Sequence, residues 1–220
     1  MTCADFDERA AILEYDGGLS RADAEAQALR EFLDLKLAAG YPGIIPGELI
    51  KADQWRRHPD IAPVAADLGL ANVHGPAWGF GHVAADGETY RPALDGETAH
   101  AAFVVPAVED GGVVDLVACT VSPRRMRSRL GVAAVVGLEE IERARETEAP
   151  LLVFDDTLRW LRGNTLGAVV VDWDRAAGDI EGVKVIMCSA SLATRLRDAT
   201  RRCWPRPTIA FAPEKMRHAA

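Results

Sequence analysis

Four aspartates follow two neighbouring apolar runs of the sequence, in positions where carboxylates could bind a metal ion. Asp155 and Asp156 come directly after the run LLVF, and Asp172 and Asp174 come after the run AVVV. Open α/β sheets place their ligands at the carboxyl ends of parallel strands. Adjacent strands lie about 4.8 Å apart, so acids at two strand ends can share one divalent ion such as Mg²⁺. The pattern favours metal-dependent phosphoryl transfer or nuclease chemistry.

Two observations favour a structural role for these acids instead. Asp156 and Asp174 stand where helices are expected to begin, and acidic side chains stabilise helix N-termini. The histidines that could act as a general base lie far upstream in the sequence. Their spacing is irregular and no cysteine accompanies them, so the sequence predicts no histidine metal site at His74, His82 or His100.

A basic cluster precedes this region in the segment SPRRMRSRLG. Its members are Arg124, Arg125, Arg127 and Arg129. Clustered arginines attract phosphates, so the functional interpretation is contact with nucleic acid. The alternative is a solvated turn that balances an acidic protein. The whole chain has 33 acidic and 25 basic residues and a net charge of −8, which argues against tight binding of nucleic acid by its surface as a whole.

The elements that must position these residues can be read from the apolar runs. Residues 150–189 contain three apolar runs, 151–154, 168–171 and 183–187, which alternate with short helical segments. Upstream, 101–121 reads as two strands joined by a tight turn at Asp110–Gly111. Short connections and right-handed crossovers then predict an α/β fold with a mainly parallel sheet and flanking helices, preceded by a β-hairpin.

A small helical hairpin is expected at the N-terminus. The first helix ends at Gly17–Gly18, and the second opens at Ser20, with Asp23 as its capping partner. The predicted organisation is a helical hairpin, a linker with an irregular region rich in glycine and aromatic residues, the α/β domain, and a tail, over residues 1–39, 40–100, 101–212 and 213–220.

The sequence indicates a cytoplasmic protein without a membrane segment. The N-terminus lacks the pattern of a secretory signal, and no apolar run reaches about 18 residues. The four cysteines, Cys3, Cys119, Cys188 and Cys203, are widely scattered. Of these, Cys119 and Cys188 lie in apolar runs and are expected to be reduced core thiols. The sequence contains no GxSxG, P-loop or HExxH motif, so no cofactor is expected, with Mg²⁺ as the alternative.

The order of a hairpin, a basic turn and then a βαβα run with acids at strand ends resembles the Toprim-type domain. This domain occurs in DNA primases of phages, plasmids and other bacterial mobile elements. The resemblance covers roughly residues 101–211 and includes the hairpin AFVVPAVEDGGVVDLVACTV. The N-terminal segment FDERAAILEYDGGLSRADAEAQAL also looks like a helical segment of proteins encoded near such primases.

The resemblance implies a magnesium site made by a glutamate after the first core strand and an Asp-x-Asp at the end of a later strand. This chain departs from that pattern at both places. Its first core strand is followed by Asp155 and Asp156, and Asp172-Trp173-Asp174 follows the second strand. The third run ends in Cys188-Ser189-Ala190, without a carboxylate. The departures predict a degenerate domain that has lost its metal.

Three functions follow from these observations. The first is a non-catalytic Toprim-like module of a mobile element, whose partner is DNA or a replication protein. The second is a Mg²⁺-dependent enzyme with Asp155, Asp172 and Asp174 as catalytic residues and Asp156 as a further metal ligand. The third is a protein-interaction or regulatory protein, in which exposed tryptophans contact the partner; the candidates are Trp160, Trp173 and Trp204.

Overall fold

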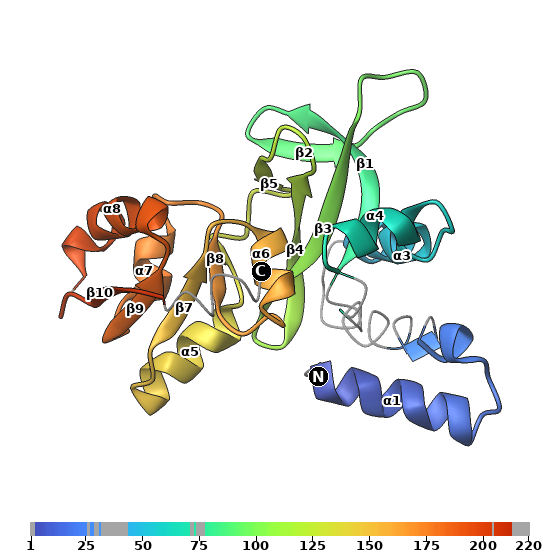
Figure 1. Cartoon of the computed structure of the whole chain (residues 1–220), viewed down its shortest axis with the longest axis horizontal. Coiled ribbons are helices and arrows are strands. Elements are labelled where there is room, and N and C mark those ends of the chain that lie inside the picture. The colour runs from blue at the N-terminus through green and yellow to red at the C-terminus, as the bar shows by residue number, and fades with distance from the viewer. Residues whose placement is uncertain are drawn as a thin grey trace.

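The computed structural model of the chain has a mixed α/β fold built on two sheets (Figure 1). The structure describes residues 3–25, 27–28, 31, 44–70, 73, 78–203 and 205–212. In this part of the chain each sheet has five strands, in the orders β2-β1-β3-β4-β5 (sheet A) and β10-β9-β7-β8-β6 (sheet B). In the same part, no helix is long and apolar enough to cross a bilayer.

Sheet A is antiparallel throughout. It contains β1 (Gly79–Asp86), β2 (Thr89–Pro92), β3 (His100–Glu109), β4 (Gly112–Thr120) and β5 (Met126–Ser128). The predicted hairpin is confirmed as β3–β4, and the two residues of its turn, Asp110 and Gly111, both have positive φ, at 49° and 69°. Such angles suit the right-handed twist of a two-residue hairpin.

Sheet B is the parallel core that the three apolar runs predicted. It contains β6 (Val135–Val136), β7 (Leu151–Phe154), β8 (Ala168–Val170), β9 (Val185–Cys188) and β10 (Thr208–Phe211). Strand β7 pairs in parallel with both β8 and β9, and β10 pairs in parallel with β9. The short strand β6 is antiparallel to β8.

The prediction of a mainly parallel sheet for the whole domain is therefore wrong. Strands β1 and β2 come from residues 40–100, which were expected to form a linker and an irregular region, and β1 pairs directly with β3. These strands are joined by a tight turn, so they run antiparallel and extend the hairpin into a sheet of its own. The same region, 40–100, also contains α3 (Ile44–Arg56) and α4 (Ile61–Asp67).

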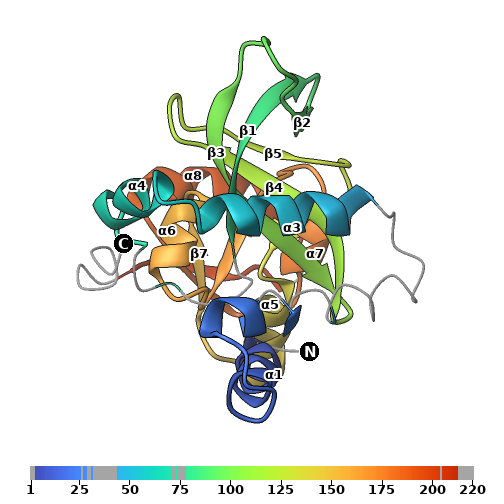
Figure 2. The same cartoon turned by 90° about the vertical axis from the view of Figure 1, so that its right-hand side faces the viewer.

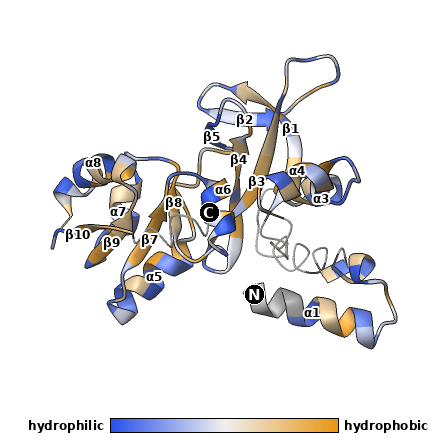
Figure 3. Ribbon diagram, in the orientation of Figure 1, coloured by the Kyte–Doolittle hydropathy of each residue, from blue (hydrophilic) through white to orange (hydrophobic). Residues whose placement is uncertain are grey.

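Helices cover both sheets. Helix α3 crosses one face of sheet A (Figure 2), and α6 (Thr157–Arg162) lies between the two sheets, where Leu158 and Leu161 pack with Phe103 and Val169. Sheet B is covered by α5 (Leu138–Thr147), α7 (Ala176–Ile180) and α8 (Ala190–Ala199), which continues into the short 3-10 helix η1 (Thr200–Arg202). The central strands of both sheets are among the most apolar ribbons of the described structure (Figure 3), whereas β2 and β5 at the edge of sheet A are more polar.

The N-terminal helical hairpin is confirmed over its described residues. Helix α1 (Cys3–Tyr15) is followed by a turn, and a second helix opens after Ser20, whose hydroxyl accepts the N–H of Asp23 at 3.2 Å. Arg9 donates to Glu31 at 2.6 Å and links the two helices. The rest of the second helix, the linker residues 40–43 and the tail lie outside the described residues.

Candidate functional site

Asp155 follows β7 and holds the ends of β7 and β9 together. Its Oδ1 atom accepts hydrogen bonds from the hydroxyls of Ser189, at 2.9 Å, and Ser191, at 2.8 Å. Its Oδ2 atom pairs with Arg159, one turn into α6. Both oxygens are therefore engaged by groups of the protein. The serine after β9 thus binds the acid after β7.

Asp156 caps helix α6, which confirms the expectation that it stands at the start of a helix. Its Oδ1 atom accepts the N–H of Arg159 at 2.9 Å, and Arg124 donates to its Oδ2 atom at 3.3 Å. The residue is only 7% exposed. A buried carboxylate that caps a helix and neutralises an arginine has a sufficient structural role.

Asp172 shapes the turn between β8 and α7. Its carboxylate accepts the N–H groups of Asp174, at 3.0 Å, and Arg175, at 3.3 Å, and lies 3.2 Å from the Arg175 side chain. Arg175 in turn donates to the carbonyl of Gly131, at 2.8 Å, and to that of Val132. Asp174 is exposed beside this turn and does not cap α7, which begins after Arg175.

The four aspartates do not form one metal site in the described structure. Asp155 binds side chains that follow β9, whereas the turn of Asp172 contacts the segment before β6. In sheet B, β7 lies between β9 and β8. Asp155 therefore makes its contacts on the β9 side of β7, and the turn of Asp172 makes its contacts on the β8 and β6 side. No group of three His, Cys, Asp or Glu side chains among the described residues could hold a metal ion.

The arginine cluster divides into two pairs. Arg124 is bound to Asp156, and Arg129 is bound to Glu48 of α3, with its Nε 2.9 Å from both carboxylate oxygens. Arg125 and Arg127 make no ion pair with any residue that the structure describes. The predicted cluster therefore provides two arginines whose charge is not neutralised by a carboxylate contact.

Arg125 and Arg127 line a groove between β5 of sheet A and the carboxyl end of β8. Its volume is about 750 Å³. Across the groove, Arg195 of α8 lies over the indole of Trp173, with its guanidinium carbon 4.4 Å from the ring centroid. We call this the arginine groove, defined by Arg125, Arg127, Trp173 and Arg195. Glu88, Asp172 and Asp174 also line it, and of these Asp172 is paired with Arg175.

No role was predicted from the sequence for Asp115, which holds the segment next to the groove. This fully buried carboxylate accepts five backbone N–H groups, at 2.8–3.1 Å, from Leu116, Arg129, Leu130, Val132 and Ala133. Five donors compensate the cost of burying the charge. An acid inside the apolar run VVDLVACTV is the signal that could have identified it, because a buried charge needs such partners.

Three cysteines, Trp160 and His82 pack against other residues of the protein. Among the described cysteines, Cys119, Cys188 and Cys203 are free and buried, and burial raises the pKa of the Cys119 thiol to about 11. Trp160 is buried and donates to the carbonyl of Gly167 at 2.9 Å. Among the histidines, His82 packs against Trp55 and Phe80. His74 and Trp204 lie outside the described residues.

The geometry thus gives one groove with unpaired arginines and an aromatic ring, next to acids that are occupied by the protein's own groups. Compared with known proteins, the chain matches no family model, no curated protein and no solved structure.

Proposed function

We propose that the chain is a non-catalytic, Toprim-like module of a bacterial mobile element that binds single-stranded nucleic acid in the arginine groove. The observation that carries the proposal is the combination of Arg125, Arg127 and Arg195 around Trp173. Proteins that bind single strands combine cations for the phosphates with planar side chains for the bases. A duplex offers its bases to such a groove less readily, because they are already stacked.

The charges support nucleic-acid binding within the groove and not binding by the protein surface as a whole. The whole chain carries −8, so binding must come from a few well-placed cations. Asp172 is neutralised by Arg175, which leaves Glu88 and Asp174 as the acids opposing the three arginines. We expect the phosphates to lie on the Arg125 and Arg127 side of the groove, away from Asp174.

The non-catalytic part of the proposal is supported by the hydrogen bonds of the acids. Asp155 is held by two serines and an arginine, Asp156 caps a helix, and Asp172 accepts two N–H groups. A divalent ion would have to displace these partners. Calorimetry with Mg²⁺ and Mn²⁺ should show no binding at millimolar metal. Binding by the wild type that Asp172→Ala abolishes would instead favour the metal-dependent enzyme.

Fluorescence anisotropy with a labelled single-stranded oligonucleotide tests the binding itself. The double variant Arg125→Ala/Arg127→Ala should bind more weakly. The slope of log K against log salt should fall by about 1.4, because each phosphate contact on a single strand contributes about 0.7. The matched control is Arg143→Ala/Arg201→Ala, which removes two exposed arginines outside the groove and changes the net charge equally. Unchanged affinity and slope in the groove variant would refute the proposal.

A further inference from the structure

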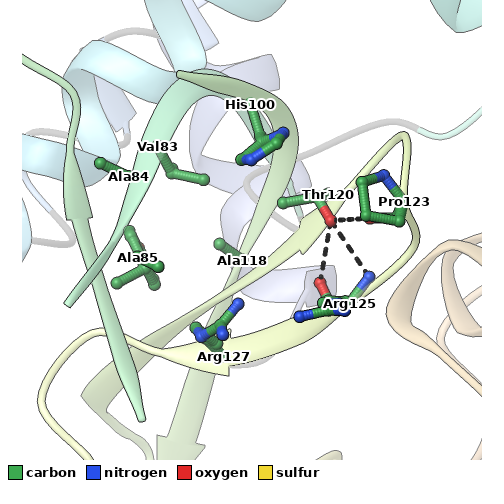
Figure 4. Close-up of a pocket in the computed structure, with 10 residues that line it drawn as sticks. Val83, Ala84, Ala85, His100, Ala118, Thr120, Pro123, Arg125 and Arg127 are labelled. Atoms are coloured by element: carbon green, nitrogen blue, oxygen red, sulfur yellow. Dashed lines mark hydrogen bonds between the residues drawn. The ribbon is translucent and has the colours of Figure 1, made fainter. Parts of the chain in front are cut away.

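A second, smaller pocket adjoins the arginine groove on sheet A (Figure 4). Its volume is about 120 Å³, and its walls come from β1, Tyr90 of β2, β3, β4, β5 and the turn before β5. His100 lies on one side, and Arg125 and Arg127 lie on the other, with Ala118 between them. Ala84, Ala85 and Ala118 leave the space open because their side chains end at the methyl group.

The charge of this pocket differs from that of the groove. None of the described residues that line it carries a carboxylate, whereas Glu88, Asp172 and Asp174 line the groove. Other arginines nearby are neutralised, Arg124 by Asp156 and Arg129 by Glu48. In an acidic chain, a pocket lined by two unpaired arginines and a histidine is suited to an anion.

The turn that carries Arg125 is fixed by Thr120. The Thr120 hydroxyl accepts the N–H of Arg125 at 3.1 Å and donates to the carbonyl of Pro123 (Figure 4). Because this hydroxyl is already bonded to the turn, Thr120 positions Arg125 and does not serve as the contact for a ligand. The polar side chains left for an anion are the two guanidinium groups, the imidazole of His100 and the hydroxyl of Tyr90, which has no hydrogen-bond partner within the described structure.

The size of the pocket limits what it can hold. A volume of 120 Å³ is about four times the ~30 Å³ that one water occupies in the liquid. This space is sufficient for one tetrahedral oxyanion. Arg125 and Arg127 line both cavities. A phosphate bound in the pocket could therefore belong to a nucleic-acid strand that lies in the groove.

We infer that this pocket binds a terminal phosphate monoester of the nucleic-acid strand, so that the chain recognises a phosphorylated strand end. The inference rests on the proposed function. A monoester carries more negative charge than an internal diester and has three free oxygens, so it can accept hydrogen bonds from both arginines and from His100. An internal phosphate would need space for the chain on both sides.

The test compares the affinity of the whole chain for oligonucleotides of one sequence with a 5′-phosphate, a 3′-phosphate or hydroxyls at both ends. One phosphorylated end should bind about ten-fold more tightly than the hydroxyl end, as expected for one charge-assisted contact. His100→Ala should remove this difference, because His100 lines the pocket and not the groove. Arg195→Ala should weaken all three oligonucleotides by the same factor. His58→Ala, an exposed histidine outside both cavities, should leave the ratio unchanged.

Equal affinity for all three ends would overturn the inference while leaving the proposed function in place. A thermal-shift series with inorganic phosphate tests whether the pocket binds phosphate when the chain binds no oligonucleotide. If no oligonucleotide binds, but phosphate raises the Tm of the wild type and not that of His100→Ala, the pocket stands and the proposed function fails. An equal rise in Tm for both proteins would refute the pocket.

Discussion

Replacing Asp115 by asparagine should destabilise the protein more than any change of similar size on its surface. Each oxygen of this buried carboxylate accepts backbone N–H groups: Oδ1 from Leu116, Arg129 and Leu130, and Oδ2 from Val132 and Ala133. An asparagine keeps one acceptor oxygen and turns its amide hydrogens toward N–H groups on the other side. At least two of these donors then lose their partner; on the Oδ2 side, Ala133 is buried and Val132 is 48% exposed.

The magnitude follows from those two donors. An unsatisfied buried group costs about 1–3 kcal/mol and a solvent-accessible one costs less, so the free energy of unfolding should fall by at least about 1–3 kcal/mol. Urea denaturation followed by circular dichroism measures this fall as a lower midpoint with an unchanged m-value. Asp86→Asn, an exposed aspartate on β1, is the control and should change the free energy by less than about 0.5 kcal/mol. A loss below about 1 kcal/mol for Asp115→Asn would refute the assigned role.

Three further changes test other parts of the fold. Asp156→Ala removes the cap of α6 and the partner of Arg124, and should cost about 0.5–2 kcal/mol in chemical denaturation; an unchanged midpoint would contradict the capping role. Gly79→Ala should cost about 1–3 kcal/mol, because the new Cβ would lie 2.5 Å from the carbonyl carbon of Ala52, whereas Gly81→Ala meets nothing within 4 Å and serves as the control. Burial raises the pKa of Cys119 to about 11, above the value of about 8.5 in the unfolded chain. The stability that its neutral thiol contributes is complete below about pH 8.5 and is lost as the pH rises toward 11, by up to about 1.4 kcal/mol per pH unit. Cys119→Ala should flatten the fall in stability over this window, and an identical pH profile would exclude the thiol as a cause.

The elements with a clear period or turn could be predicted from the sequence. The hairpin β3–β4 was predicted because two apolar runs flank Asp110–Gly111, and the parallel strands β7, β8 and β9 because each is a short apolar run. The burial pattern of β1 alternates in pairs, and its sequence, GFGHVAAD, has two glycines and a histidine. These residues do not have the alternation of apolar and polar side chains that predicts a strand. They form a strand because they pair with β3.

The candidate site was harder to predict because its residues are paired across long distances in the chain. Arg124 and Asp156 are 32 residues apart, and Arg129 and Glu48 are 81 apart. Sequence position grouped four arginines, whereas the contacts leave Arg125 and Arg127 unpaired within the described structure and add Arg195 from another helix. The sequence grouped the four aspartates in the same way, and their hydrogen bonds separate them.

The segment before β6 is fastened from both sheets at once. Its N–H groups are bound by Asp115 of sheet A, and its carbonyls at Gly131 and Val132 are bound by Arg175, which follows β8 of sheet B. One sheet therefore cannot open without breaking contacts of the other. We expect both sheets to unfold as one cooperative unit. The amide protons of Val132 and Ala133 should then exchange with solvent only through global unfolding, with the free energy of global unfolding.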